Sequence, residues 1–143
     1  MKIMVAYDGT LQAKDALVYG IDKARETGGE VVALHVFNSG LFIDYDANVD
    51  AEAIALRDSA KFIEEARALI RKNGAGVRTS FFTTEGNPEE AVIRFAKERH
   101  ADILLCPPKF KGIINKYRKA LGESELTEKA AKMNLAVLTT EAM

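Results

Sequence analysis

Two segments of the chain hold residues that could bind a polar ligand. Asp8 follows the apolar run of residues 2–7 and precedes Gly9-Thr10, which places a carboxylate at the end of an expected strand. The stretch from Lys109 to Lys119 holds five cations and no acidic residue, and such a group attracts an anion. Both features also have a structural interpretation, because Asp8 could hold the turn or cap a helix and the basic stretch could be a solvated face.

Motifs of catalytic sites are missing from the sequence. It has no Gly-x-Ser-x-Gly nucleophile elbow, no GxxxxGK[ST] phosphate loop and no HExxH metal motif. The two histidines, His35 and His100, stand apart from any partner at the spacing of a metal site. The one cysteine, Cys106, ends an apolar run, so we expect a buried thiol without a redox role. These residues indicate a binding or signalling module and not an efficient enzyme.

Composition and charge describe a globular domain. Of the 143 residues, 48% are hydrophobic and 29% are charged, which excludes wholesale disorder and predicts a single domain over residues 1–143. A net charge of −1 gives no overall attraction to nucleic acid or to an anionic membrane. No apolar run reaches the roughly 18 residues that a membrane span needs. With one cysteine and no visible signal peptide, the cytoplasm is the expected compartment.

Strand and helix patterns alternate along the chain. Strands are expected at residues 2–7, 31–37, 77–83, 101–106 and 135–140, and helices at residues 11–27, 51–72, 88–99 and 124–133. Thr10 and Asn87 are the expected N-caps of the first and third helices, and Phe62 belongs to the buried face of the second. Strands that alternate with helices need crossover connections, which predict an α/β fold with an open, parallel five-stranded sheet covered by helices on both faces. The third strand is the most polar, as is typical of a sheet edge.

An ordered set of short motifs resembles the universal stress protein family. The motifs are Tyr7-Asp8-Gly9-Thr10, Ala33-Leu34-His35-Val36, Gly86-Asn87-Pro88, Ala101-Asp102-Ile103-Leu104 and Ala136-Val137-Leu138. Together they cover essentially the whole chain, in order and at the right spacing. The resemblance implies a Rossmann-like fold of the adenine nucleotide alpha hydrolase type with strand order 3-2-1-4-5. The ligand crevice would then lie between the first and fourth strands, where the strand order reverses.

The resemblance also implies a ligand, which is ATP or AMP with magnesium. In nucleotide-binding members, the residue at Asp8 contacts the ribose or the adenine edge, and the backbone at Val36 meets adenine. Hydrolysis of ATP would be slow at most.

A glycine signature in such members follows the fourth strand. It consists of Gly, two residues, Gly, nine residues, Gly, and then Ser or Thr. Gly112 and Gly122 match the second and third glycines, whereas Lys109 replaces the first and Ser124 stands one position late. The resemblance therefore carries only part of the phosphate site to this chain.

Departures from the signature weaken the phosphate side of the expected site. Pro107-Pro108 stands where nucleotide-binding members have Gly-Ser, and proline has no backbone N–H to offer. Glu123 follows the last glycine, and a carboxylate about 4 Å from a phosphate charge costs roughly 1 kcal/mol in water. We expect a degraded site that binds ATP weakly or not at all. The alternative is a true ATP-binding protein, in which Lys109 or Lys111 would contact phosphate.

Three segments are expected to contact other parts of the protein or a partner. The resemblance implies a homodimer, and the last strand, Leu135 to Thr140, is an apolar edge that a second copy would cover. The stretch from Lys109 to Lys119 could fold as an amphipathic helix that packs on the crevice or presents a basic surface to a protein partner. Leu41 to Tyr45 is an apolar loop patch that could be core packing, a lid or a contact surface.

Overall fold

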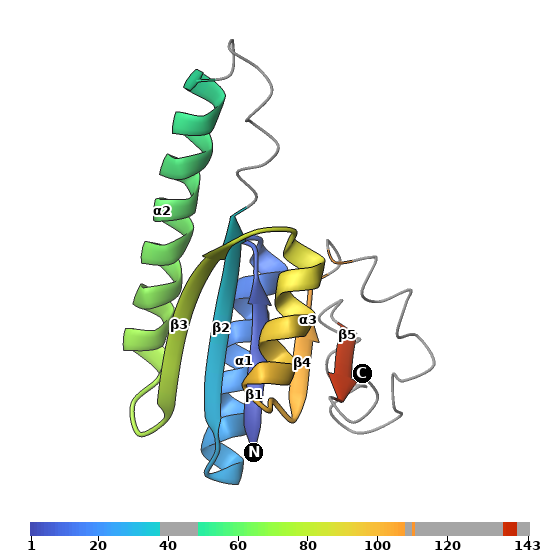
Figure 1. Ribbon diagram of the computed structural model, residues 1–143. Helices are drawn as coiled ribbons and strands as arrows, with labels where there is room; N and C mark the ends of the chain where they lie inside the picture. The colour runs from blue at the N-terminus through green and yellow to red at the C-terminus, as the bar shows by residue number, and fades with distance from the viewer. Residues whose placement is uncertain (38–48, 108–109, 111–135, 140–143) are drawn as a thin grey trace.

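The protein is an α/β domain built on one sheet, as the computed structural model in Figure 1 shows. The structure describes residues 1–37, 49–107, 110 and 136–139. Its elements are β1 (Lys2–Tyr7), α1 (Leu11–Thr27), β2 (Glu30–Phe37), α2 (Val49–Asn73), β3 (Arg78–Glu85), α3 (Pro88–Glu98), β4 (Ile103–Cys106) and β5 (Ala136–Thr139). Among these elements, no helix combines the length and the apolar character that a bilayer crossing needs.

The sheet has the strand order β3-β2-β1-β4-β5, which confirms the order that the resemblance implied. Strands β1 to β4 are parallel, and the polar strand β3 lies at one edge, as expected. The expectation of five parallel strands is wrong for β5, which runs antiparallel to β4, with Ala136 opposite Cys106 and Thr139 opposite Ile103. An apolar run specifies burial but not direction, and an antiparallel edge strand is common on a parallel sheet. The helix expected at 124–133 lies outside the described residues.

Helices cover both faces of the sheet, and each face has its own core. On one face, α1 and α2 pack on alternate residues of the strands, including Ile3, Val5 and Leu105. On the other face, α3 packs on Met4 and Leu104 and on the residues next to them. Figure 1 shows α1 behind the sheet and α3 in front of it. Alternate residues of one strand therefore enter different cores, which explains why the central strands are apolar throughout.

Local signals set the ends of the helices that begin near the crevice. Thr10 precedes α1, and its side chain accepts a hydrogen bond from the Ala13 N–H at 3.2 Å. Asn87 precedes α3 and accepts from the Glu90 N–H at 3.2 Å, while Pro88 occupies the first turn. Both N-caps confirm the sequence prediction.

Candidate functional site

A cavity of about 380 Å³ lies at the carboxyl ends of β1 and β2. Its described lining comprises Tyr7, Asp8, His35, Val36, Phe62, Asn87, Pro88, Glu89 and Phe110. The place is the one at which doubly wound sheets bind ligands, beside the strand where the order reverses. The structure thus brings together two of the expected site residues, Asp8 and Val36. The other four, Lys109, Gly112, Gly122 and Ser124, lie outside the described residues.

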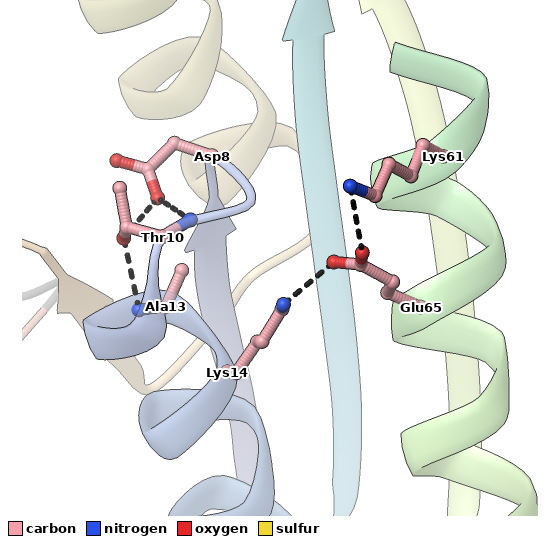
Figure 2. A network of polar contacts seen from close by, with 6 residues as sticks. All are labelled: Asp8, Thr10, Ala13, Lys14, Lys61 and Glu65. Atoms are coloured by element: carbon pink, nitrogen blue, oxygen red, sulfur yellow. Dashed lines mark hydrogen bonds and ion pairs between the residues drawn. The ribbon is translucent and has the colours of Figure 1, made fainter. Parts of the chain in front are cut away.

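The carboxylate of Asp8 has two oxygens in different situations. Its Oδ1 accepts hydrogen bonds from the Thr10 N–H at 3.0 Å and the Thr10 hydroxyl at 2.5 Å, and the Thr10 oxygen in turn caps α1 (Figure 2). Its Oδ2 is buried and has no hydrogen-bond partner among the described residues. Asp8 therefore holds the turn with one oxygen and keeps the other as an acceptor, so the two interpretations of this residue are compatible. A buried carboxylate oxygen without a partner is rare, so this acceptor is open to a donor from a ligand, an ion or a water.

The glycine after Asp8 lets helix α2 approach the turn. Gly9 has φ +78°, and a Cβ atom there would lie 2.4 Å from the Phe62 ring, which is too close for any side chain. Phe62 therefore covers the turn and forms one wall of the cavity. The sequence assigned Phe62 only to the core, because helical periodicity shows which face is buried and not what lies opposite.

A buried histidine lies beside the crevice. His35 is 7% exposed, its Nδ1 lies 3.2 Å from the Tyr7 carbonyl oxygen, and its Nε2 lies 3.1 Å from the Ser59 hydroxyl oxygen. Sequence reasoning found no partner for His35, because Ser59 is 24 residues away on another element. No signal in the sequence alone indicates this contact.

A network of charges connects α1 and α2 beside the crevice. Glu65 of α2 contacts Lys14 of α1 at 2.6 Å and Lys61 of its own helix at 4.0 Å (Figure 2). The hydrogen bond from Lys14 is the main cause that lowers the pKa of Glu65. Burial, with smaller contributions from Glu65 and Asp8, raises the pKa of Tyr7 to about 12, so its phenol stays protonated at neutral pH.

The acids and amides in the described lining bear on whether a phosphate could bind there. Two of its residues, Asp8 and Glu89, are acidic, and none is a lysine or an arginine. Pro107 has no backbone N–H, and the Phe110 N–H already donates to the Pro107 carbonyl at 3.1 Å. Neither of these two described residues of the segment after β4 therefore offers a free amide hydrogen to a phosphate. Phe110 instead fills space, since it is only 5% exposed.

Metal and thiol chemistry find no support in the described part of the chain. No group of three or more His, Cys, Asp or Glu side chains there could hold a metal ion. Cys106 is buried, as expected, and burial raises its thiol pKa to about 12.

Comparison with known proteins gives relatives for most of the chain. The model of the universal stress protein family matches residues 1–113. The universal stress protein MJ0531 of Methanocaldococcus jannaschii is 23% identical over 107 residues, which are 73% of this chain and 62% of that protein. The chain thus spans less than two thirds of the length of this curated relative.

Two solved structures are similar in fold. A universal stress family protein from Burkholderia pseudomallei has a TM-score of 0.61 at 21% identity and covers 82% of this chain and 89% of its own. The universal stress protein from Archaeoglobus fulgidus in complex with dAMP has a TM-score of 0.60 at 21% identity, with 80% and 86% covered. Since the family model spans β1 to β4 together with the crevice that they form, this chain belongs to the universal stress protein family.

Proposed function

We propose that this protein is a homodimeric stress-response module of the cytoplasm with a degraded nucleotide site. Its crevice would receive the nucleoside part of an adenine nucleotide but hold the phosphates poorly, so that ATP binds weakly or not at all. One observation carries the proposal: Asp8 Oδ2 is buried at a cavity of about 380 Å³ and has no partner within the described part of the chain. That volume lies within the usual range of small-molecule sites, about 300–1,000 Å³.

The nucleoside side of the cavity has the groups that a purine and a sugar require. Asp8 Oδ2 can accept from a ribose hydroxyl or an adenine amino group, and the rings of Phe62 and Phe110 supply apolar surface. The Archaeoglobus fulgidus relative in complex with dAMP supports an adenine nucleotide as the ligand class.

The part of the proposed site that would hold the phosphates has few groups that favour an anion. Glu89 adds negative charge to the lining, Pro107 lacks an N–H, and the N–H of Phe110 is already used. The cations from Lys109 to Lys119 and the glycines Gly112 and Gly122 would have to compensate for these losses. With so few free donors, we expect no efficient enzymatic activity and at most slow ATP hydrolysis.

Titration calorimetry with adenosine, AMP and ATP, each with and without magnesium, tests the proposal. We expect the three affinities to agree within about threefold and to lie near millimolar, because the phosphates add nothing. A micromolar affinity for ATP that adenosine lacks, and that Gly122→Val abolishes, would establish the alternative of a true ATP-binding protein. If none of the three ligands gave heat, the cavity would not bind the nucleoside either, and the proposed nucleoside site would be wrong.

The proposed dimer would form through β5, which pairs on one side with β4 and lies last in the described strand order. Light scattering should then give a mass near twice 15.7 kDa. Backbone N–H groups point alternately to the two sides of a strand. Of the two variants Val137→Pro and Leu138→Pro, one therefore removes an N–H that points toward β4 and the other removes an N–H that points away from it. We expect the variant that lacks the outward-facing N–H to be a folded monomer. If both variants are dimers, pairing through β5 is contradicted.

The basic stretch from Lys109 to Lys119 is the proposed contact for a protein partner.

A further inference from the structure

A serine and a histidine meet at a second cavity, which shares only His35 with the described lining of the proposed nucleotide site. Ser59 of α2 and His35 of β2 lie with Oγ and Nε2 3.1 Å apart. Both line a cavity of about 470 Å³ formed by residues of β2, α2 and β3. Ser59 is half-buried, so its hydroxyl is held in place and is still reachable from that cavity.

The hydrogen bonds of His35 determine which of its two ring nitrogens accepts a proton from Ser59. The Tyr7 carbonyl oxygen can only accept, so in the neutral ring the proton resides on Nδ1, 3.2 Å from that oxygen. Nε2 then presents its lone pair to Ser59, whose hydroxyl donates to it. This is the tautomer in which a histidine removes the proton of a serine nucleophile. The Phe62 ring packs edge-to-face with the imidazole, with ring centroids 6.1 Å apart, and limits its rotation.

We propose that Ser59 is a nucleophile activated by His35 and that it accepts an acyl group from a small activated ester or thioester. The bond from Ser59 Oγ to the acyl carbon forms while the bond from that carbon to the alcohol or thiol breaks. The proton of the Ser59 hydroxyl passes to His35 Nε2 and then to the departing alkoxide or thiolate. The product is an acylated Ser59, and the step needs no oxidant or reductant.

The lining of this cavity specifies the kind of acyl donor. Ile63 and Phe37 give apolar surface for a short acyl chain, whereas Glu85 adds a negative charge that disfavours anionic donors. Thr83 is the neighbour of His35 across the β2–β3 ladder and also lines the cavity, which makes its hydroxyl the candidate donor to the oxygen that becomes negative. A short, uncharged acyl group is therefore the favoured substrate.

Acetylation by p-nitrophenyl acetate, mapped on peptides by mass spectrometry, tests this proposal. We expect one acetyl group on Ser59, none in that peptide after Ser59→Ala, and a rate at least tenfold lower in His35→Gln. Ser80→Ala is the matched control, because Ser80 is also half-buried and has no histidine partner among the described residues. It should leave the acetylation of Ser59 unchanged.

A measurement on the unaltered chain covers the case in which His35→Gln fails to fold. In urea the arrangement of Ser59 and His35 is lost, so acetylation of Ser59 should fall to the rate of Ser80. A native rate at Ser59 no higher than at Ser80 would overturn the proposal. A folded His35→Gln variant that reacts as fast as the original chain would overturn it too. Acyl transfer to Ser59 stands independently of nucleotide binding, since neither outcome requires a nucleotide.

Discussion

The amino ends of the strands, called the amino edge below, and their carboxyl ends, called the carboxyl edge, both border cavities, and the amino-edge cavity is larger than the proposed nucleotide cavity but offers a ligand fewer unpaired buried groups. The amino edge has a cavity of about 570 Å³, against about 380 Å³ at the carboxyl edge. At the amino edge Lys2 already has partners: its Nζ contacts Glu30 at 3.3 Å and the Arg99 carbonyl at 2.7 Å, and its backbone N–H donates to Asp102 at 2.7 Å. At the carboxyl edge Asp8 keeps a buried oxygen without a partner in the described structure.

A buried polar atom without a described partner, and not volume, therefore distinguishes the carboxyl end, since the charged side chains of the amino end are paired or exposed. Charges that pair with one another gain little from a ligand, because each new contact replaces an existing one. An isolated acceptor gains a full hydrogen bond when a donor arrives. Substitutions made at equivalent places on the two edges can test this difference.

The largest contrast is expected between two glycines with positive φ. Gly9→Ala at the carboxyl edge combines backbone strain with overlap against Phe62, which together cost about 3 kcal/mol. Gly28→Ala at the amino edge has the strain alone, since nothing lies within 4 Å of the added methyl group, and should cost about 1 kcal/mol. Urea unfolding measures both, and equal losses would mean that Phe62 moves aside freely.

The next effect concerns two aspartates. Asp8→Asn keeps an oxygen for Thr10 but replaces the accepting Oδ2 with an amide nitrogen that cannot accept, so adenosine affinity should fall about tenfold, or roughly 1.4 kcal/mol. Asp102→Asn at the amino edge should change that affinity by less than about twofold, because Asp102 contacts Lys2 there. Calorimetry or ligand-observed NMR compares the two, and an equal loss in both variants would contradict the assignment of the carboxyl edge.

A smaller effect is expected for Lys2. Lys2→Met removes the contacts with Glu30 and the Arg99 carbonyl, and because both charged side chains are more than a quarter exposed, the loss should be about 0.5–1 kcal/mol. Adenosine affinity should not change. Lys97→Met on the exposed side of α3 is the control and should be near neutral. If Lys2→Met lowered the free energy of unfolding by several kcal/mol, the contacts of Lys2 would contribute more to stability than expected for partly exposed side chains.

The smallest effect is the pH dependence that comes from Glu65. Its pKa is lowered on folding by the hydrogen bond from Lys14, so its contribution to stability is complete above the unfolded pKa of about 4.3 and is lost as the pH falls through the folded value. Unfolding free energies of the original chain and Glu65→Gln should converge as the pH is lowered below about 4.3. Glu64→Gln, whose described partner is Arg67 at 3.5 Å, is the control. A constant difference down to pH 2 would contradict the role of Lys14.

Local chemistry accounts for the parts of the fold that the sequence predicted. Thr10 and Asn87 cap helices because their side chains reach backbone N–H groups three residues ahead, a contact that needs only neighbours in the chain. The strand order came from the family resemblance, as did the position of Asp8 at the crevice.

Contacts between elements that are distant in the chain could not be predicted from the sequence. The direction of β5 depends on how the chain returns to β4, and the residue types of a four-residue strand do not indicate a direction. The approach of Phe62 to Gly9 and of Ser59 to His35 depends on the rotation of α2 over the sheet, which periodicity alone leaves undetermined.

The contact of Phe62 with Gly9 joins the turn at Asp8 to helix α2. Since the ring leaves no room for a methyl group at Gly9, any movement of the turn toward α2 requires the Phe62 ring to move as well. For a ligand that binds at Asp8, we therefore expect substitutions that loosen the packing of α2 on the sheet to weaken binding, although none of them touches the ligand.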